Sequence, residues 1–156
     1  MGKQIMVTIS LQNIKDLNSE SLSEISSITI DKCIIDHIDF CSLCFSEEVV
    51  ISGCVIQKID MLSTFFEKGL RFENNVIIGD AIFEAGGHNA APISFSGNVF
   101  HGFFHVFDCV FDAPLIVRDN IFLKGTDLLT KECKGFDNSF EGGLSIDNNL
   151  GTLNVW

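Results

Sequence analysis

Two cysteines separated by two residues are the first candidates for chemistry in this sequence. Cys41 and Cys44 enclose Ser-Leu, the CxxC spacing at which two thiolates hold zinc or form a redox disulfide. No second CxxC and no pair of histidines at zinc-finger spacing accompanies them. Cys41 and Cys44 are therefore candidate metal or redox residues, and the competing interpretation is that they are ordinary structural residues.

Carboxylates supply a second candidate site. Asp39 and Asp60 are 21 residues apart, with Asp36 and Asp80 in the same region of a repeating pattern described below. Like charges stacked on neighbouring strands repel each other, so a bound cation or a partner's lysine would relieve Asp39 and Asp60. The competing interpretation is that these acids are simply solvated. Clustered acids also cleave glycosides, but that chemistry needs a long groove with basic or aromatic subsites, and the chain has one Trp and no Tyr.

The four histidines add no recognisable catalytic set. They are His37, His88, His101 and His105, and none has a Ser or Cys nucleophile placed by a known motif. We therefore expect no catalytic residues, no enzyme activity and no cofactor.

The elements that position these residues follow from an internal repeat. Each copy reads apolar, any, apolar, any, polar, then Asn or Cys, then an aliphatic residue, and it usually ends on an apolar residue. The Asn or Cys position recurs at steps of about 22 residues, at Cys33, Cys54, Asn75, Asn98, Asn120 and Asn149. Apolar residues fall in pairs two apart, offset by five or six residues, as in Leu70/Phe72 and Ala81/Phe83. Such pairs point to one side of a short strand, so each period predicts four strands with corners between them.

The predicted fold is therefore an all-β, single-stranded, right-handed parallel β-helix of about 22 residues per coil and six to seven coils. We expect one domain over residues 1–156, with a degenerate coil or cap at 1–24, an inserted loop at 129–136 and a cap or interface at 150–156. A smaller insertion lies near Gly87–Pro92. Cys33, Cys54 and Cys109 occupy inward slots, where they act as small hydrophobic residues.

The five-residue step, with a small residue two before a large one, resembles the pentapeptide-repeat proteins. Pairs such as Cys33/Ile35 and Cys109/Phe111 carry this resemblance, which spans most of residues 25–151. The sequence departs from that family's A(D/N)Lxx pattern, and its Asn column is also similar to the asparagine ladder of pectin-lyase-like β-helices. The resemblance implies a quadrilateral β-helix. It also implies a possible activity, because some acidic pentapeptide-repeat proteins mimic DNA and bind type II topoisomerases.

Composition sets the chemical context. The chain has 156 residues, 46% of them apolar, 15 Phe, and a formal net charge of −11. Its pI is near 4.5, which argues against direct binding to nucleic acid phosphates. Its apolar runs are too short for a transmembrane helix or a secretory signal. The many thiols in core slots fit a reducing compartment, so we expect a cytoplasmic protein without membrane association.

An aliphatic column is the strongest candidate for an interaction surface. The outward residue beside each Asn or Cys slot is never charged, and the predicted interface consists of Ile34, Val55, Val76, Val99, Ile121 and Leu150. The last coil adds Leu153, Val155 and Trp156, because an uncapped β-helix end exposes strand edges. A competing interpretation is that β-branched residues merely suit strands.

Three functions remain open on the sequence alone. The first is a non-catalytic protein-interaction or scaffolding module that forms a homo-oligomer, most simply a dimer, side to side or end to end. The second is an acidic DNA mimic that inhibits a DNA-binding enzyme such as a type II topoisomerase. The third is a carbohydrate-binding or carbohydrate-active β-helix.

Overall fold

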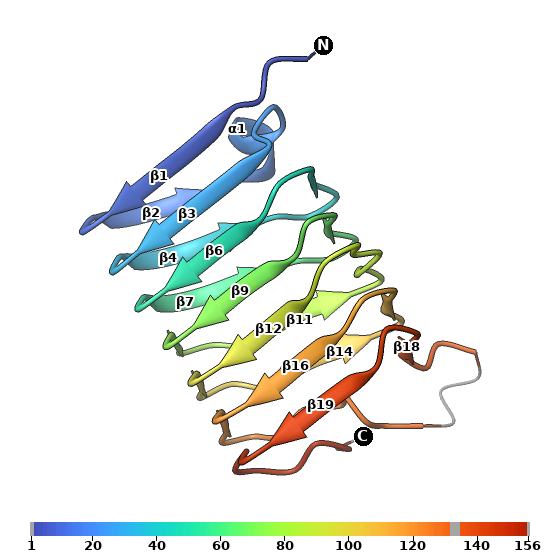
Figure 1. Ribbon diagram of the computed structural model, residues 1–156. Coiled ribbons are helices and arrows are strands. Elements are labelled where there is room, and N and C mark those ends of the chain that lie inside the picture. Colours follow the sequence, from blue (N-terminus) through green and yellow to red (C-terminus); the bar gives the residue numbers. More distant parts are fainter. Residues whose placement is uncertain (1, 132–134, 156) are drawn as a thin grey trace.

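The chain forms a parallel β-helix whose strands stack in register from one end to the other. The computed structural model describes residues 2–131 and 135–155. Seven strands form the first face, so the chain makes about six full turns between its first and last pass (Figure 1). They are β1 (Met6–Ser10), β3 (Ser27–Asp31), β6 (Val49–Ser52), β9 (Leu70–Glu73), β12 (Ile93–Ser96), β16 (Leu115–Arg118) and β19 (Leu144–Asp147).

The second sheet covers two faces because its early strands are long. Its strands are β2 (Asn13–Leu17), β4 (Ile34–Asp39), β7 (Val55–Asp60), β10 (Val76–Ile77), β11 (Ala81–Glu84), β13 (Val99–Phe100), β14 (Phe104–Phe107) and β17 (Ile121–Phe122). β7 pairs with β10 through its first residues and with β11 through its last. In later turns a corner separates these two faces. Gly79 and Gly102 stack at that corner, where a Cβ on Gly102 would lie 2.3 Å from the Gly79 backbone.

Short strands form the fourth face. β5 (Cys44–Phe45) pairs with β8 (Phe65–Phe66), and β15 (Val110–Phe111) pairs with β18 (Ser139–Phe140). Gly87 bridges Phe65 and Val110 and joins the two pairs. Every ladder is parallel. The turns have the four faces that the apolar pairs predict, but β4 and β7 each run across two of them as one strand.

The register between turns matches the sequence repeat. Val55 pairs with Val76 at a step of 21, Val76 with Val99 at 23, and Val99 with Ile121 at 22. The step from Leu115 to Leu144 is 29 and contains the predicted insertion. The insertion begins against the last coil, where Leu129 N donates to Leu153 O and Thr130 is buried. Its later part projects from the side of the stack (Figure 1), and Cys133 and Lys134 lie outside the described residues.

Phenylalanine fills the interior in stacked columns. Phe100 and Phe104 lie 4.5 Å apart between ring centroids, and Phe100 and Phe122 lie 5.1 Å apart, with both pairs nearly parallel. All three rings are buried. The chain has 15 Phe and no Tyr. This fits a closed interior, because a buried tyrosine hydroxyl would need a hydrogen-bond partner.

Buried asparagines link successive coils, as the Asn column predicts. The Asn75 backbone N–H donates to Asn98 Oδ1 at 2.9 Å, and the Asn98 N–H donates to Asn120 Oδ1 at 3.0 Å. The Asn98 amide also donates to Phe72 O at 2.8 Å. Cys54 takes the same slot one coil earlier, and its Sγ accepts from the Cys33 N–H at 3.4 Å. These bonds satisfy polar atoms that the interior would otherwise leave without partners.

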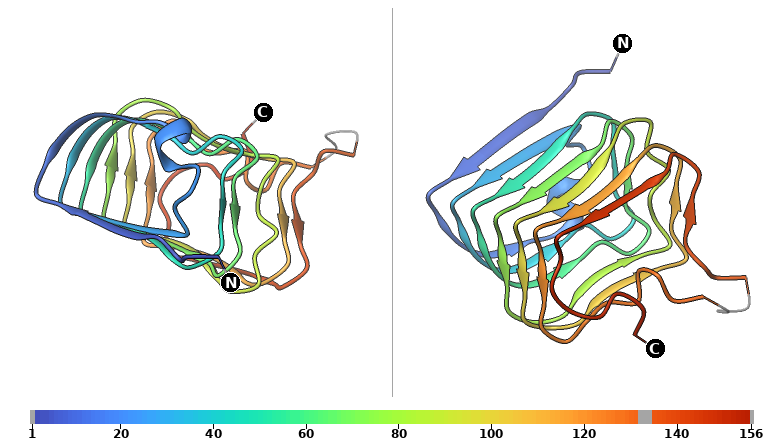
Figure 2. Two further views of the ribbon diagram at one scale, coloured as in Figure 1. Left: turned by 90° about the horizontal axis from the view of Figure 1, so that it is seen from above. Right: turned by 60° about the horizontal axis from the view of Figure 1, so that its bottom comes forward.

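The two ends of the β-helix differ. α1 (Ser19–Leu22) is a single turn in the first coil, capped by the Asn18 side chain, which accepts from Ser21 N. It buries Leu22 over the core. The strands β1 and β19 lie at opposite ends of the stack (Figure 2). Residues 2–24 form the first coil, which includes one helical turn.

Candidate functional site

The aliphatic column is continuous on the second face. The register places Ile34 beside Val55, Val55 beside Val76, Val76 beside Val99, Val99 beside Ile121, and Ile121 beside Leu150. Strand spacing of about 4.8 Å gives five steps, or roughly 24 Å of aliphatic surface. The sequence-predicted residues therefore come together as one outward line.

Exposure along this column is greatest at its ends. Leu150 is 65% exposed, Ile34 is 56% exposed and Val55 is 41% exposed, while Val76, Val99 and Ile121 are half-buried by their neighbours. Two residues in the next outward column add to the apolar surface, with Leu123 at 59% and Ile78 at 40% exposure. A contiguous apolar patch of this kind marks an interaction site more often than scattered apolar residues do.

Hydrogen bonds in the interior fix the backbone that carries this column. Each outward residue follows directly after a ladder residue, so Val76 follows Asn75 and Val99 follows Asn98. The ladder bonds fix the backbone of the buried position, and the paired strands fix the next residue outward. The column is therefore presented by a rigid backbone, which lowers the entropy lost on binding.

An open hollow borders the amino-terminal end of the column. Asn13, Ile14, Lys15, Ile34 and Asp36 line about 370 Å³ of space there. An apolar side chain from another molecule can reach Ile34 through this hollow.

The carboxy-terminal candidates lie partly against their own chain. Leu153 O accepts from Leu129 N at 2.8 Å, and the Val155 N–H donates to Thr126 O at 3.0 Å. Both side chains are half-buried. Residues 152–155 thus complete the third face of the last coil, and Trp156 lies outside the described residues.

The acids at Asp39 and Asp60 lie side by side, as their 21-residue spacing predicts. Each carboxylate accepts from a backbone N–H two residues on, Asp39 from Cys41 at 2.9 Å and Asp60 from Leu62 at 3.0 Å. Burial alone would raise the pKa of Asp39, but hydrogen bonds from Cys41 outweigh it and lower the pKa. These carboxylates therefore act as local turn acceptors.

The two CxxC thiols face carboxylates. Burial, with hydrogen bonds to Asp39 and Asp60, raises the pKa of Cys41 to about 12. Burial and the Glu67 carboxylate, whose Oε1 lies 3.3 Å from the sulfur, raise the pKa of Cys44. Metal binding and redox exchange need the thiolate, and this setting favours the thiol. Within residues 2–131 and 135–155, no group of three His, Cys, Asp or Glu side chains is arranged to hold a metal ion.

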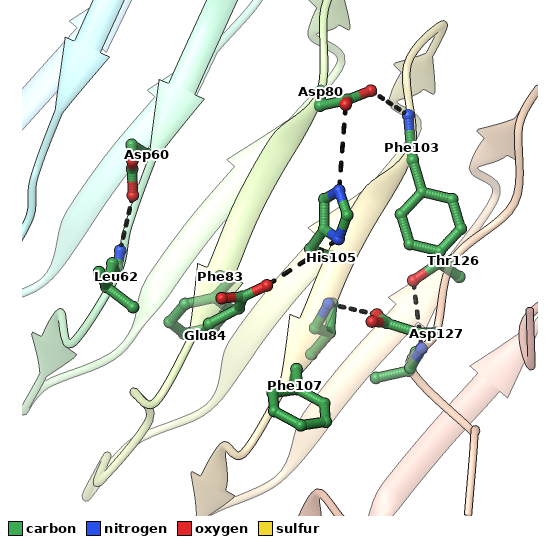
Figure 3. A network of polar contacts seen from close by, with 12 residues as sticks. Asp60, Leu62, Asp80, Phe83, Glu84, Phe103, His105, Phe107, Thr126 and Asp127 are labelled. Atoms are coloured by element: carbon green, nitrogen blue, oxygen red, sulfur yellow. Dashed lines mark hydrogen bonds and ion pairs between the residues drawn. The ribbon is translucent and has the colours of Figure 1, made fainter. Parts of the chain in front are cut away.

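The third face places His105 among acidic side chains, a grouping that the sequence does not predict. His105 on β14 lies 4.0 Å from Asp80 Oδ2 through Nε2 and 3.9 Å from Glu84 Oε1 through Nδ1 (Figure 3). Asp127 Oδ1 accepts from the neighbouring Val106 N–H at 2.5 Å. Burial raises the pKa of Glu84 and of Asp127. His105 is 25 residues from Asp80, 21 from Glu84 and 22 from Asp127, so only the exact register of three turns brings these residues together.

Other sequence candidates are distributed over separate faces. His88 is exposed, because the chain turns it outward beside Gly87, and it contacts Phe65 and Asp112. Asn89 is buried in its place and donates to Ala91 O at 2.8 Å. On the first face, the acids Asp31 and Glu73 alternate with serines, and Arg118 interrupts the line.

Within the described part of the chain, the helical segment lacks the length and hydropathy that crossing a membrane requires. Comparison with known proteins finds no match, because no family model fits the sequence and no characterised protein or solved structure resembles it significantly.

Proposed function

We propose that this chain is a non-catalytic protein-interaction module whose rigid β-helix self-associates through the aliphatic column of its second face. The single observation that carries the proposal is the unbroken register of the six uncharged residues from Ile34 to Leu150.

Burial of this column supplies a driving force. Removing apolar surface from water contributes about 25 cal/mol per Å². Leu150 and Ile34 are the most exposed residues of the column and stand at its two ends, and Leu123 is exposed in the neighbouring column. These three side chains would lose the most solvent contact. The rigid backbone beneath them limits the entropic cost of association.

A second copy of the chain fits this surface. A two-fold axis between Val76 and Val99 places each of these residues opposite the other, and places Ile34 opposite Leu150. The interface is then isologous and closes at two subunits, the commonest symmetry of soluble oligomers. The long side chain of Leu150 would meet the hollow beside Ile34.

Light scattering of a matched pair of variants tests the proposal. Val76→Asp with Val99→Asp places two charges at the centre of the column. We expect it to remove the dimerisation that the column supports and to leave a folded chain that is monomeric at low concentration. Ser94→Asp with Ile116→Asp changes outward residues of the first face and should leave the dimer intact. A native chain that is monomeric in this assay, or a dimer that survives the column charges, would contradict the proposal.

A further inference from the structure

The two ends of the β-helix expose unpaired strand edges of matching geometry. Within residues 2–131 and 135–155, β1 pairs with β3 alone and β19 pairs with β16 alone. The inward residues of these edge strands are half-buried, whereas the equivalent residues of β3 and β16 are buried. They are Val7 and Ile9 on β1 and Leu144 and Ile146 on β19. An edge of this kind is a template for another strand.

The backbone groups on the two edges are complementary. In a parallel ladder, alternate residues of an edge strand bond to the neighbour and the others point away. Leu11 N donates to Asp31 O at 3.1 Å, so the alternate residues Thr8 and Ser10 direct their N–H and C=O groups away from β3. Asp119 N donates to Asp147 O at 3.1 Å, so Leu144 and Ile146 direct theirs away from β16. β19 and β1 can therefore continue the parallel sheet across two molecules.

The ladder of side chains sets the register of that contact. From Cys33 to Asn120, the N–H of each ladder residue donates to the side chain of the next turn, as Asn120 N does to Asn149 Oδ1 at 3.0 Å. The Asn149 N–H has no acceptor among the described residues. Gln12 lies opposite Cys33, in the ladder slot of the first coil, because its neighbour Asn13 pairs with Ile34. Its exposed amide has no partner in the part of the chain that the structure describes, and it carries the acceptor that Asn149 lacks.

We propose that copies of this chain stack head to tail, with β19 of one copy pairing with β1 of the next. Asn149 N–H then donates to Gln12 Oε1 of the next copy, and Leu144 and Ile146 stack on its Val7 and Ile9. The contact joins two different surfaces and does not close on itself, so it builds an open linear assembly. It uses neither Val76 nor Val99 and does not rest on the proposed function.

A proline at the amino-terminal edge tests the contact. All measurements use a Val76→Asp, Val99→Asp background, so that the aliphatic column contributes nothing. Thr8→Pro removes an N–H that the single molecule does not use, at an exposed edge position where proline is tolerated. Thr8→Val keeps the N–H and is the control.

Light scattering over a range of concentrations gives the readout. We expect the background chain and Thr8→Val to increase in mass with concentration, and Thr8→Pro to weaken association at least tenfold with an unchanged circular dichroism spectrum. Monomers at every concentration in all three, or equal association of Thr8→Pro and Thr8→Val, would overturn the proposal.

Mixing two blocked chains tests its direction. Ile146→Arg blocks the carboxy-terminal edge, and Ser145→Arg, one residue away on the outward side, is its control. In the Val76→Asp, Val99→Asp background, Thr8→Pro and Ile146→Arg should each be monomeric alone. Their mixture should give a one-to-one dimer and nothing larger. A mixture that remains monomeric while circular dichroism shows both chains folded would overturn head-to-tail stacking.

Discussion

Asn98 shows how one buried side chain holds three turns together. Its Oδ1 accepts from Asn75 N, and its amide donates to Phe72 O and to Asn120 Oδ1. Asn98→Leu would leave the buried Asn75 N–H without its acceptor and would remove one donor from the buried Phe72 carbonyl. We expect it to lower the free energy of unfolding by about 1–3 kcal/mol, measured by urea denaturation.

Asn98→Cys is the matched control, because cysteine already occupies this slot at Cys54. There the sulfur accepts from Cys33 N at 3.4 Å and lies 3.3 Å from Ser52 O. The cysteine variant should therefore cost less than the leucine variant. Equal costs would show that side-chain hydrogen bonding at Asn98 contributes nothing to stability.

Lys32 holds a backbone conformation that its side chain disfavours. Its φ is +52°, and the equivalent corner one turn later is Gly53 with φ +65°. A left-handed conformation costs a non-glycine residue roughly 1–2 kcal/mol. The Lys32 ion pair with Asp31 is long at 3.8 Å and exposed, so its loss costs little.

We expect Lys32→Gly to raise the free energy of unfolding by about 1 kcal/mol, after allowing for the greater freedom of glycine in the unfolded chain. The thermal midpoint should rise accordingly. Lys15→Gly, in the strand β2, should lower the midpoint. A Lys32→Gly variant that melts below the native chain would contradict this account of the corner.

Spacing predicts the buried residues of the ladder but not the residues at irregular positions. From Cys33 to Asn120 the ladder residues repeat at steps of 21 to 23, and all of them are buried. Asn149 follows the insertion at a step of 29 and is half-buried. Cys109 is buried in an inward slot of another column. His88 lies in a step that is longer than its neighbours. There the chain buries Asn89 in place of His88, because the extra residue shifts the inward position by one.

At the scale of elements, paired apolar residues predict the strands but not their lengths. β4 and β7 run unbroken across two faces, whereas residues 78–80 separate β10 from β11. Tight stacking of Gly79 on Gly102 explains the break. Predicting the break would require knowing this contact between turns. α1 was not predicted, although Asn18 is a good helix cap, because a single turn carries no periodic signal.

Glu84 and Asp127, two acids of the third face, should make the stability of the folded chain depend on pH. Burial raises the pKa of Glu84 and of Asp127 in the folded chain. The folded chain therefore binds these protons more tightly, which adds stability below the ordinary values of 4.5 and 3.8. That contribution is lost as the pH rises through the raised pKa values. Glu84→Gln should raise stability at pH 7 and change it little at pH 4, measured by urea denaturation.

Asp39→Asn is the opposite case, because hydrogen bonds from Cys41 lower the pKa of Asp39 despite its partial burial. The stability that this carboxylate contributes is present above its ordinary pKa of 3.8 and is lost as the pH falls through the lowered value. We expect Asp39→Asn to destabilise the chain at pH 7. The same sign of effect in Asp39→Asn and Glu84→Gln would contradict these environments.

At the scale of the whole molecule, the repeat was sufficient to predict the solenoid and the position of its outward column. Each turn adds the same arrangement to the last, so a local pattern determines a long-range structure. The histidine and acids around His105 could not be predicted in this way. Their positions depend on steps of 21 to 23 residues between turns, and an error of one residue moves a side chain to the opposite side of the strand.

The solution mass of Thr8→Pro tests the central claim, self-association through the aliphatic column, most directly. This variant has the column intact and the amino-terminal edge blocked. Light scattering should show its mass rising with concentration and levelling at twice the 17.2 kDa of one chain. A mass that stays at 17.2 kDa over the whole concentration range would contradict the account.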